Sequence, residues 1–356
     1  MFPPLVYDFD QKTNESSSLI KFQPSSHLLI YNFTSTKKHS CEFHESAWLS
    51  RDFRASRVSL EVYPQISFLG TGCAIPSKYR NVSCIYCQIN ESTIMFMDAG
   101  EGAYQQVIRK FGHAGAREKM KSLKTIWISH LHADHHLGLV TLLKVSYELG
   151  VVPLVIAPKA VVYWLLKFFR AGVDSIRFEY TVISNMSIAT EEICARLCLD
   201  SFVNVPVEHC MDAFGLVMSH KSGWKIVYSG DTRPCPRLVE EGKGATILIH
   251  EATFSDEMPE DAIKRSHCTT GEALRVGDEM SAGLVVLTHF SQRYPKLSQF
   301  TEHVSKFVSA FDMMTIFPGI DKARLQKVRL ESEKLLKETE EDDNDEGIGH
   351  QVFTDA

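Results

Sequence analysis

Short apolar runs alternate with polar and glycine-containing stretches from residue 63 onward. Residues 65–70, 84–89 and 93–97 read as strands, because each run is short and contains β-branched and aromatic side chains. From there strands alternate with helices, which we predict at residues 103–111 and 159–170. Further strands are expected at residues 152–156, 216–218, 225–228, 246–249 and 284–287. Alternation of this kind is typical of an α/β fold.

The two ends of the chain differ from this central pattern. Residues 1–60 mix Ser, Thr and Asn with short apolar runs, and we expect an N-terminal appendage or linker there. Residues 61–318 are predicted to form the main domain. Residues 319–356 predict a strongly charged helix followed by an acidic tail, in which residues 338–346 are mostly Asp and Glu.

Composition narrows the class of protein. With 356 residues, of which 44% are hydrophobic, the chain can bury one large core with appendages or form two domains. A net charge of −6 argues against a uniformly basic nucleic-acid-binding protein, although local basic clusters can still hold phosphates. Nine cysteines without regular spacing, and a start without a basic-then-apolar leader, indicate a reducing intracellular compartment. No apolar run approaches the roughly 20 residues of a membrane helix, so we expect no membrane association.

Four side chains that can bind metal stand within six residues, directly after the strand-like run 125–128. In extended chain, side chains two residues apart project to the same side, so His130 and His132 can bind one ion. As the backbone turns, Asp134 and His135 can reach a second ion. The alternative is a polar loop, but burying these groups against a strand costs free energy unless something binds them. The pattern therefore predicts two metal ions.

Two metal ions need further ligands, and later strand ends offer them. Asp231 follows a predicted strand and a glycine that lets the backbone approach closely, so its carboxylate can reach both ions. His209 and His289 also stand beside predicted strands, where each alone could be an ordinary core histidine. Together these residues give each ion three ligands and a shared aspartate. His136 is expected to point elsewhere and to support the site without binding an ion.

A dinuclear metal site of this composition has a recognisable chemistry. Two ions about 3.5 to 4 Å apart acidify water and stabilise both the attacking and the leaving oxygen of a displacement at phosphorus. Hydrolysis of a phosphodiester or of another ester follows from such a site. The histidine motif alone does not distinguish these substrates.

Further motifs accompany the histidine cluster. They are Phe-Leu-Gly-Thr-Gly at 68–72, Pro-Ser-Lys-Tyr-Arg-Asn-Val-Ser at 76–83, Ser-Gly-Asp-Thr at 229–232, His-Glu-Ala-Thr at 250–253 and His-Phe-Ser-Gln-Arg-Tyr at 289–294. With His-Leu-His-Ala-Asp-His at 130–135, they resemble the metallo-β-lactamase superfamily and, within it, the tRNase Z family, endonucleases that remove 3′ trailers from precursor tRNA. The resemblance runs from about residue 63 to residue 310.

The resemblance implies a four-layer αββα sandwich with two mixed β-sheets and a dinuclear zinc site at the sheet edges, in a catalytic domain over residues 61–318. Manganese is the alternative metal. The implied ligands fall into two groups of three and one shared residue: His130, His132 and His209 for one zinc, Asp134, His135 and His289 for the other, and Asp231 between them.

The resemblance also implies catalytic roles. Asp134 would orient the attacking hydroxide, and Glu251 would keep His267 charged so that it protonates the leaving 3′ oxygen. The family's His-Ser-Thr motif reads His-Cys-Thr at 267–269 here, which keeps the histidine and changes the middle residue. A helix start capped by Thr269 or Thr270 is compatible with this role.

Two cations resemble the family loop that contacts RNA near the cut. Lys78 and Arg80 would hold precursor tRNA by its phosphates, with a solvated basic turn as the alternative. The likeness is to the C-terminal half of the long eukaryotic form, whose N-terminal half carries a tRNA-binding arm. Neither residues 1–60 nor a long Gly/Pro-rich insertion supplies an arm here. We therefore expect a fragment, an isoform or a subunit that needs a partner.

The resemblance leaves other hypotheses open. It favours residence in the nucleus, the mitochondrion or both, with the cytosol as an alternative, and it allows a homodimer. A different dinuclear-zinc hydrolase, such as a small phosphodiesterase or a thioesterase, would share the metal ligands and would not need Lys78, Arg80, Glu251 and His267. A non-enzymatic binding remnant of a longer protein is a third hypothesis.

Overall fold

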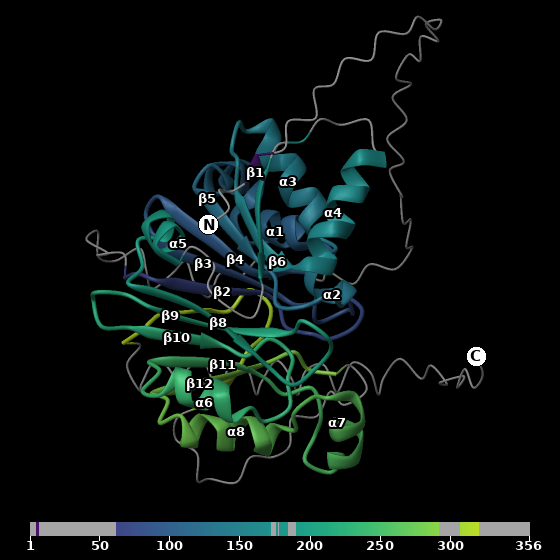
Figure 1. The fold of residues 1–356 in the computed structure, drawn as a ribbon, viewed down its shortest axis with the longest axis vertical. Coiled ribbons are helices and arrows are strands. Elements are labelled where there is room, and N and C mark those ends of the chain that lie inside the picture. The colour runs from purple at the N-terminus through teal and green to yellow at the C-terminus, as the bar shows by residue number, and fades with distance from the viewer. Residues whose placement is uncertain are drawn as a thin grey trace, which may run out of the picture. The chain divides into compact units, whose positions relative to one another are not determined.

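The computed structural model describes residues 62–171, 176, 178–183, 190–291 and 307–319, together with the short strand Leu5–Val6 (Figure 1). The chain divides into two compact units, Met1–Phe9 with Tyr63–Ala356 and, separately, Asp10–Val62. Nearly all of the second unit lies outside the described residues, as does the sequence after Gly319. The expectations for residues 1–60 and 319–356 therefore stay predictions.

The first sheet is mixed. Its eight strands, within the described residues, run in the order β1 (Leu5–Val6), β7 (Glu179–Ile183), β6 (Leu154–Pro158), β5 (Leu123–Trp127), β4 (Thr93–Ala99), β3 (Cys84–Asn90), β2 (Gln65–Gly70) and β14 (Thr315–Ile316). The strands from β7 to β4 pair in parallel, and the others pair antiparallel. In β4, Met95 and Met97 face one buried cluster, whereas Ile94 and Phe96 face another. Burial on both faces explains why the middle of this strand, residues 94–97, is apolar.

The second sheet is also mixed. Its six strands, in the part of the chain that is described, run in the order β13 (Phe307–Ser309), β12 (Leu284–Thr288), β11 (Ile247–Glu251), β10 (Lys225–Tyr228), β9 (Phe214–Ser219) and β8 (Ser201–Pro206). The strands β10 to β13 are parallel, while β8, β9 and β10 form an antiparallel meander. In β10, Ile226 and Tyr228 face the same buried cluster as Met95 and Met97 of β4, whereas Val227 faces the opposite side of its sheet.

Helices cover the outer faces of both sheets, and one further helix, over residues 190–197, packs Ile193 and Leu197 into the cluster between the sheets (Figure 1). They are α1 (Ala103–Met120), α2 (Ala133–His136), α3 (Leu139–Glu148), α4 (Lys159–Ala171), α5 (Thr190–Leu197), α6 (Pro236–Gly242), α7 (Pro259–Arg265) and α8 (Thr270–Glu279). Val107 of α1 and Leu165 of α4 pack against the first sheet, and Leu238 of α6 packs against the second. Trp127 and Val286 belong to the cluster between the sheets, which also contains Met95 and Met97 of β4 and Ile226 and Tyr228 of β10. The predicted four-layer αββα sandwich is confirmed.

Several elements differ from the sequence prediction. The helix predicted to end at Phe111 is interrupted at Gly112, whose φ 71° and ψ 165° are not helical, and a second helical segment continues across this kink to Met120. Strands β7, β8, β13 and β14 were not predicted. Strand β8 shows why. Only Phe202 and Val205 of its six residues are buried, so it lacks the apolar signature of the inner strands.

The two sheets are joined where β4, β5 and β10 end. The Ser129 carbonyl, just after β5, accepts a hydrogen bond from the Phe214 amide of β9 at 3.0 Å. Trp127 Nε1 donates to Asn204 Oδ1 at 2.7 Å, and the Tyr228 hydroxyl donates to Asp98 Oδ2 at 2.7 Å. Loops that follow strands of both sheets are therefore held at one common edge.

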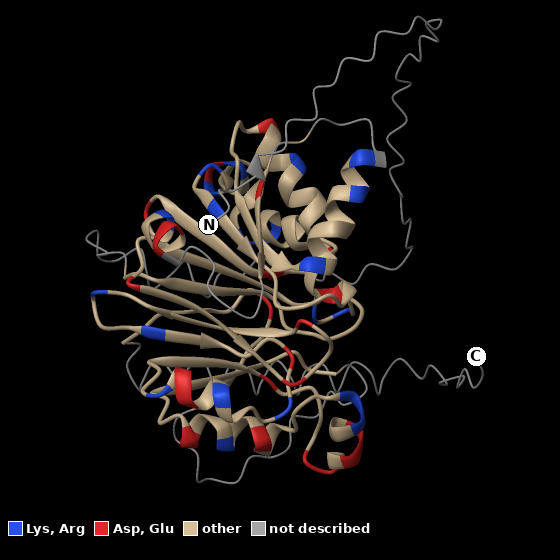
Figure 2. Cartoon of the chain, viewed as in Figure 1, with Lys and Arg blue, Asp and Glu red and all other residues tan. Residues whose placement is uncertain are grey.

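Charged residues lie mostly outside the sheets. Figure 2 shows Lys, Arg, Asp and Glu mainly on the helices and connecting loops, whereas the strands are largely tan, the colour of all other residues. This distribution fits strands that are buried on both faces. Among the described helices, none is both long and apolar enough to span a bilayer.

Candidate metal centre and active site

The structure brings all the predicted metal ligands together at the common edge of the two sheets. They come from loops that are distant in sequence and adjacent in space: His130 and His132 after β5, Asp134 and His135 in α2, His209 between β8 and β9, Asp231 after β10, and His289 after β12. Each strand ends immediately before its ligand loop, so the sheets fix where the loops begin.

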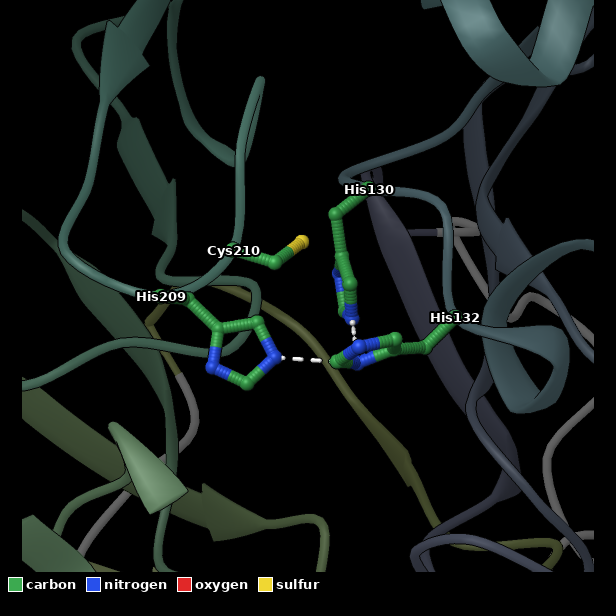
Figure 3. A group of neighbouring side chains, drawn as sticks. All are labelled: His130, His132, His209 and Cys210. Atoms are coloured by element: carbon green, nitrogen blue, oxygen red, sulfur yellow. Dashed lines mark hydrogen bonds between the residues drawn. The ribbon is translucent and has the colours of Figure 1, made fainter. Parts of the chain in front are cut away.

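Three imidazoles converge from two loops in the first group (Figure 3). His130 Nε2 lies 3.0 Å from His132 Nδ1, and His209 Nε2 lies 3.0 Å from the same atom. Burial lowers the pKa of all three rings, so each is neutral near pH 7. A neutral ring offers one nitrogen lone pair, and three such lone pairs within this space suit one cation.

The second group lies beside the first. His135 Nε2 is 3.2 Å from His289 Nε2, which is 3.4 Å from Asp134 Oδ2. Asp231 Oδ2 lies between the groups, 3.5 Å from His130 Nε2 and 3.3 Å from His135 Nε2. Its other oxygen, Oδ1, is buried without a hydrogen-bond partner. A buried carboxylate oxygen without a partner is costly, and a metal ion between the groups would satisfy it.

Hydrogen bonds behind the rings determine which nitrogen faces the centre. His209 Nδ1 donates to the Ser266 carbonyl at 2.8 Å. The Thr253 hydroxyl gives its proton to Glu251, so at 2.8 Å it accepts from His289 Nδ1. In the neutral rings both Nε2 atoms therefore carry the lone pair that a metal ion requires.

The electrostatics of the centre also favour cations. Burial alone would lower the pKa of His135, but the carboxylates of Asp231, Asp98 and Asp134 raise it well above its usual value. Burial acts to raise the pKa of Asp231, yet the neighbouring histidines, His135 foremost, hold it well below its usual range. The buried carboxylates thus favour a positive charge at the centre. A metal ion that binds here would displace the proton from the His135 ring. The donor set fits zinc, which nitrogen and oxygen ligands bind.

Two residues support the ligands from behind. Asp98, at the end of β4, accepts from His135 Nδ1 at 2.7 Å, from the Ser129 amide at 2.7 Å and from the Tyr228 hydroxyl. Asp98 was not predicted as a site residue, although its place at a strand end beside β5 was a usable signal. His136 Nδ1 donates to the His132 carbonyl at 3.0 Å and its ring packs on Trp164, so it points away from the group, as predicted.

Beside the second group lies a carboxylate–imidazole pair. His267 Nδ1 is 2.8 Å from Glu251 Oε1, and the other oxygen of Glu251 accepts from the Thr253 hydroxyl at 2.6 Å. Burial would lower the pKa of His267, but the Glu251 carboxylate outweighs it and raises the pKa to about 9. The ring is therefore a cation near pH 7, with Nε2 free of this pair. This is the arrangement of a proton donor.

The changed middle residue of the His-Cys-Thr motif is buried behind this pair. Cys268 Sγ donates to the Thr232 carbonyl at 3.0 Å and so ties its segment to the loop that carries Asp231. Thr269 caps α8, with the reciprocal Thr269–Glu272 hydrogen bonds of a capping box. The helix start predicted at this position is confirmed, and it coexists with the His267 arrangement.

The two predicted RNA contacts lie in different surroundings. Lys78 is exposed, with its ammonium 5.0 Å from the Tyr79 ring. The Arg80 guanidinium instead turns into the protein, where it donates to Thr71 Oγ1 at 2.7 Å and to the Ala310 carbonyl at 2.8 Å. It also lies over the Phe290 ring at 4.6 Å. Arg80 thus anchors its loop to the segment that follows His289.

The turn after β4 packs tightly against the segment that carries Asp134. A Cβ atom at Gly100 would lie 2.2 Å from the Asp134 carbonyl oxygen, so Gly100→Ala is expected to destabilise the fold by about 1–3 kcal/mol. It should also displace Asp134. Denaturant unfolding checks this, with Gly115→Ala in α1 as control, where the nearest atom is 3.2 Å away and the expected change is below about 1 kcal/mol. Equal stability of the two variants would contradict the packing argument.

Known proteins share both the sequence pattern and the fold. The family described as "Beta-lactamase superfamily domain" matches residues 93–290, more than half of the chain. "Zinc phosphodiesterase ELAC protein 2" of Macaca fascicularis is 41% identical over 285 residues, which cover 73% of this chain and 34% of that protein. "Ribonuclease Z, mitochondrial" of Drosophila melanogaster is 38% identical over 272 residues, which cover 72% and 35%. The chain spans about a third of the length of these curated relatives.

A solved structure gives the same picture. A long form RNase Z from yeast superposes with a TM-score of 0.70 at 27% identity, covering 78% of this chain and 44% of that one. Partial coverage of long proteins fits the predicted likeness to the C-terminal half of a long form, and the names confirm the resemblance to tRNase Z. With the matched family pattern and the αββα fold, the chain belongs to the beta-lactamase superfamily.

Proposed function

We propose that the chain is the catalytic part of a zinc-dependent endoribonuclease that removes the 3′ trailer from precursor tRNA. The observation that carries this is the protonated His267–Glu251 pair beside the two ligand groups. A ribose oxygen leaves poorly without a proton, so cleavage of RNA needs an acid as well as a charge-stabilising centre. Relatives named ribonuclease Z and zinc phosphodiesterase support this substrate class.

We assign two zinc ions to this centre. One would be held by the first group and the other by the second, with a shared carboxylate: His130, His132 and His209; Asp134, His135 and His289; and Asp231. Bound there, zinc would supply the positive charge that acidifies water and stabilises the phosphoryl oxygens. The orphaned Asp231 Oδ1 and the converging Nε2 atoms support this assignment.

Two side chains of the protein would carry out the remaining steps, which are orientation of the attacking water and protonation of the leaving oxygen. The Ala74 amide donates to Asp134 Oδ2 at 2.7 Å, which fixes this carboxylate where it can orient the attacking water. His267 would give its proton to the leaving 3′ oxygen, and Glu251 would stabilise the charged ring until transfer. Attack and departure would thus be served by different side chains.

For RNA contact, the two predicted cations take different parts. The exposed Lys78 ammonium can reach a phosphate, whereas Arg80 shapes the loop through Thr71 and Ala310. Loss of the Lys78 charge would weaken binding alike for all RNA sequences, because phosphate contacts carry no base information. The rest of the tRNA surface would be held by a part of the protein, or a partner, that lies beyond this chain's match to its relatives.

Asp98 should matter for zinc affinity although it is not itself one of the predicted metal ligands. In Asp98→Asn, one accepting oxygen becomes an amide that cannot accept from His135 Nδ1, so the ring loses its orientation. We expect zinc to bind about 10- to 100-fold more weakly. Competition with a chromophoric chelator measures this, and Asp278→Asn on the exposed face of α8 is the control. Unchanged affinity would refute the supporting role of Asp98.

Cleavage of a labelled precursor tRNA with a 3′ trailer, with and without chelator, tests the proposed function. Chelator-sensitive cutting just after the discriminator base, mapped to a single nucleotide, is the expected result. Turnover of small phosphodiesters or thioesters by a zinc-loaded protein that leaves precursor tRNA intact would favour another dinuclear hydrolase. Absence of bound zinc after purification without chelator would favour the binding-remnant hypothesis.

Relatives also bear on where the protein acts. One of them is named as a mitochondrial ribonuclease Z. We therefore propose processing of mitochondrial precursor tRNA, with nuclear residence and homodimerisation kept as predictions. Fractionation of cells that express the tagged protein would test the compartment.

A further inference from the structure

Next to the proposed proton donor lies an ion pair that has no part in the cleavage described so far. Arg233 directly follows the Ser-Gly-Asp-Thr motif. Its guanidinium binds the Glu272 carboxylate through two hydrogen bonds, from Nη1 to Oε2 at 2.7 Å and from Nη2 to Oε1 at 2.6 Å. Only 19% of the Arg233 side chain and 13% of the Glu272 side chain are exposed. A pair with two hydrogen bonds and little contact with water is more rigid than an exposed ion pair, so it can hold a third group in place.

That third group is the backbone of the proton donor. Arg233 Nη1 also donates to the His267 carbonyl at 2.6 Å. The His267 amide donates to the Ala262 carbonyl at 2.9 Å, so both polar groups of the His267 backbone are hydrogen-bonded. The His267 ring is held by Glu251 at 2.8 Å. Two of these three contacts come from the segment 251–267 itself, and Arg233 supplies the link to the loop that follows β10.

Arg233 is itself held beside the metal centre. It lies two positions after Asp231, and its backbone amide donates to the Glu208 carbonyl, one position before a predicted ligand, at 2.9 Å. The guanidinium therefore starts from a fixed point among the ligand loops. It joins this point to the start of α8, because Glu272 also accepts from the Thr269 amide at 3.0 Å. The segment that carries the proton donor is thus tied to the loops that carry the metal ligands.

We propose that Arg233 is a positioning residue for cleavage: it holds the His267 backbone so that the ring stays where it can protonate the leaving oxygen. This rests on the proposed function, in which His267 donates that proton. A planar guanidinium can bind a carboxylate with two N–H groups and still donate to a carbonyl, whereas a glutamine amide has only two N–H groups in all. A displacement of about 1 Å can slow a reaction by about 100-fold, so this hold matters although Arg233 touches no reacting atom.

A purely structural role of the ion pair predicts a different result. Glu272 is part of the capping box of α8, so loss of Arg233 would then loosen the helix and slow every reaction alike. A positioning role acts through proton donation and therefore depends on the leaving group. A ribose oxygen needs the proton, whereas p-nitrophenolate leaves as a stable anion. The ratio of the rates on the two kinds of substrate separates the two roles.

The test compares the zinc-loaded full chain with its Arg233→Gln variant. We expect the single-turnover rate on precursor tRNA to fall by about 10- to 100-fold with KM unchanged, and hydrolysis of a p-nitrophenyl phosphodiester to change less than about twofold. Glu272→Gln keeps a side chain that can cap α8 and removes the carboxylate, so it should shift the ratio in the same direction. The control is Arg117→Gln, which breaks an exposed ion pair with Glu148 and should change neither rate.

A second measurement needs no substrate. The hydrogen bond between the charged His267 ring and Glu251 should give a low-field proton resonance, which His267→Ala identifies by its absence. We expect Arg233→Gln to lose this resonance and Arg117→Gln to keep it. Equal slowing on both substrates, a wild type without the resonance, or its survival in Arg233→Gln would overturn the proposal. If the wild type leaves precursor tRNA uncut, the proposed function fails, and the resonance still decides whether Arg233 holds the ring.

Discussion

Replacing Asp231 with alanine is expected to lower the rate of phosphodiester cleavage by about a thousandfold or more, which corresponds to about 4 kcal/mol of transition-state stabilisation. The reason is its central position. Asp231 Oδ2 lies 3.3–3.8 Å from nitrogens of His130, His135, His209 and His289, which belong to both ligand groups. Without it, both positions lose their shared anionic ligand, and zinc content should fall below two per chain. Single-turnover cleavage and elemental analysis measure these effects.

The matched control for this variant is Asp278→Ala, which removes an exposed carboxylate from α8. It should keep both zinc content and rate. Circular dichroism of the Asp231→Ala protein separates loss of metal from loss of the fold. An Asp231→Ala protein that kept two zinc ions and more than about a tenth of the rate would refute the bridging role.

Replacing His267 with alanine is expected to slow cleavage of precursor tRNA by about 10²- to 10⁴-fold, the usual contribution of a general acid. A p-nitrophenyl phosphodiester should be affected much less, because its leaving group departs as a stable anion. The ratio of the two rates is the measurement. A similar loss on both substrates would instead mean that His267 holds the centre together, through its ring contacts with His209 and His289.

The pH profile provides a second measurement on this residue. Although burial works against it, Glu251 raises the pKa of His267 to about 9. A proton donor acts only while protonated, so the rate should fall about tenfold per pH unit above pH 9. In Glu251→Gln the raising charge is gone, and the falling limb should move to lower pH. His220→Ala, which changes a turn beside Trp224, should leave the limb in place.

The grouping of the candidate metal ligands could be predicted from sequence because their signal is local. His130 to His135 stand in one short segment directly after a strand, and the strand's side-chain alternation tells which of them share a side. Asp231 and His289 are single residues, yet each follows an apolar run that ends at the same edge. The inner strands were predictable for the same reason, since burial on both faces makes them apolar throughout.

What could not be predicted depends on contacts between distant segments. Asp98 lies 37 positions from His135, and nothing between them records the hydrogen bond that makes it part of the centre. The direction of Arg80 depends on Ala310, 230 positions away, and on the Phe290 ring. From local sequence, Arg80 is only a positively charged residue in a loop. Its contacts with distant residues show that it fixes this loop in place. The helical segment after Gly112 is a similar case, because Ala116 and Met120 are buried in the cluster that covers the first sheet, and the local sequence does not record that packing.

The distance in sequence between His135 and His289 has a consequence for biosynthesis. These residues are 154 positions apart, although their Nε2 atoms lie 3.2 Å apart. A ribosome adds about 5–20 residues per second, so about 8–30 s pass between the synthesis of the two. The nascent chain already carries His130, His132 and His209 before β12 exists. The donors of the first position are therefore synthesised before the last donor of the second, and occupation of both positions would require that translation has passed His289.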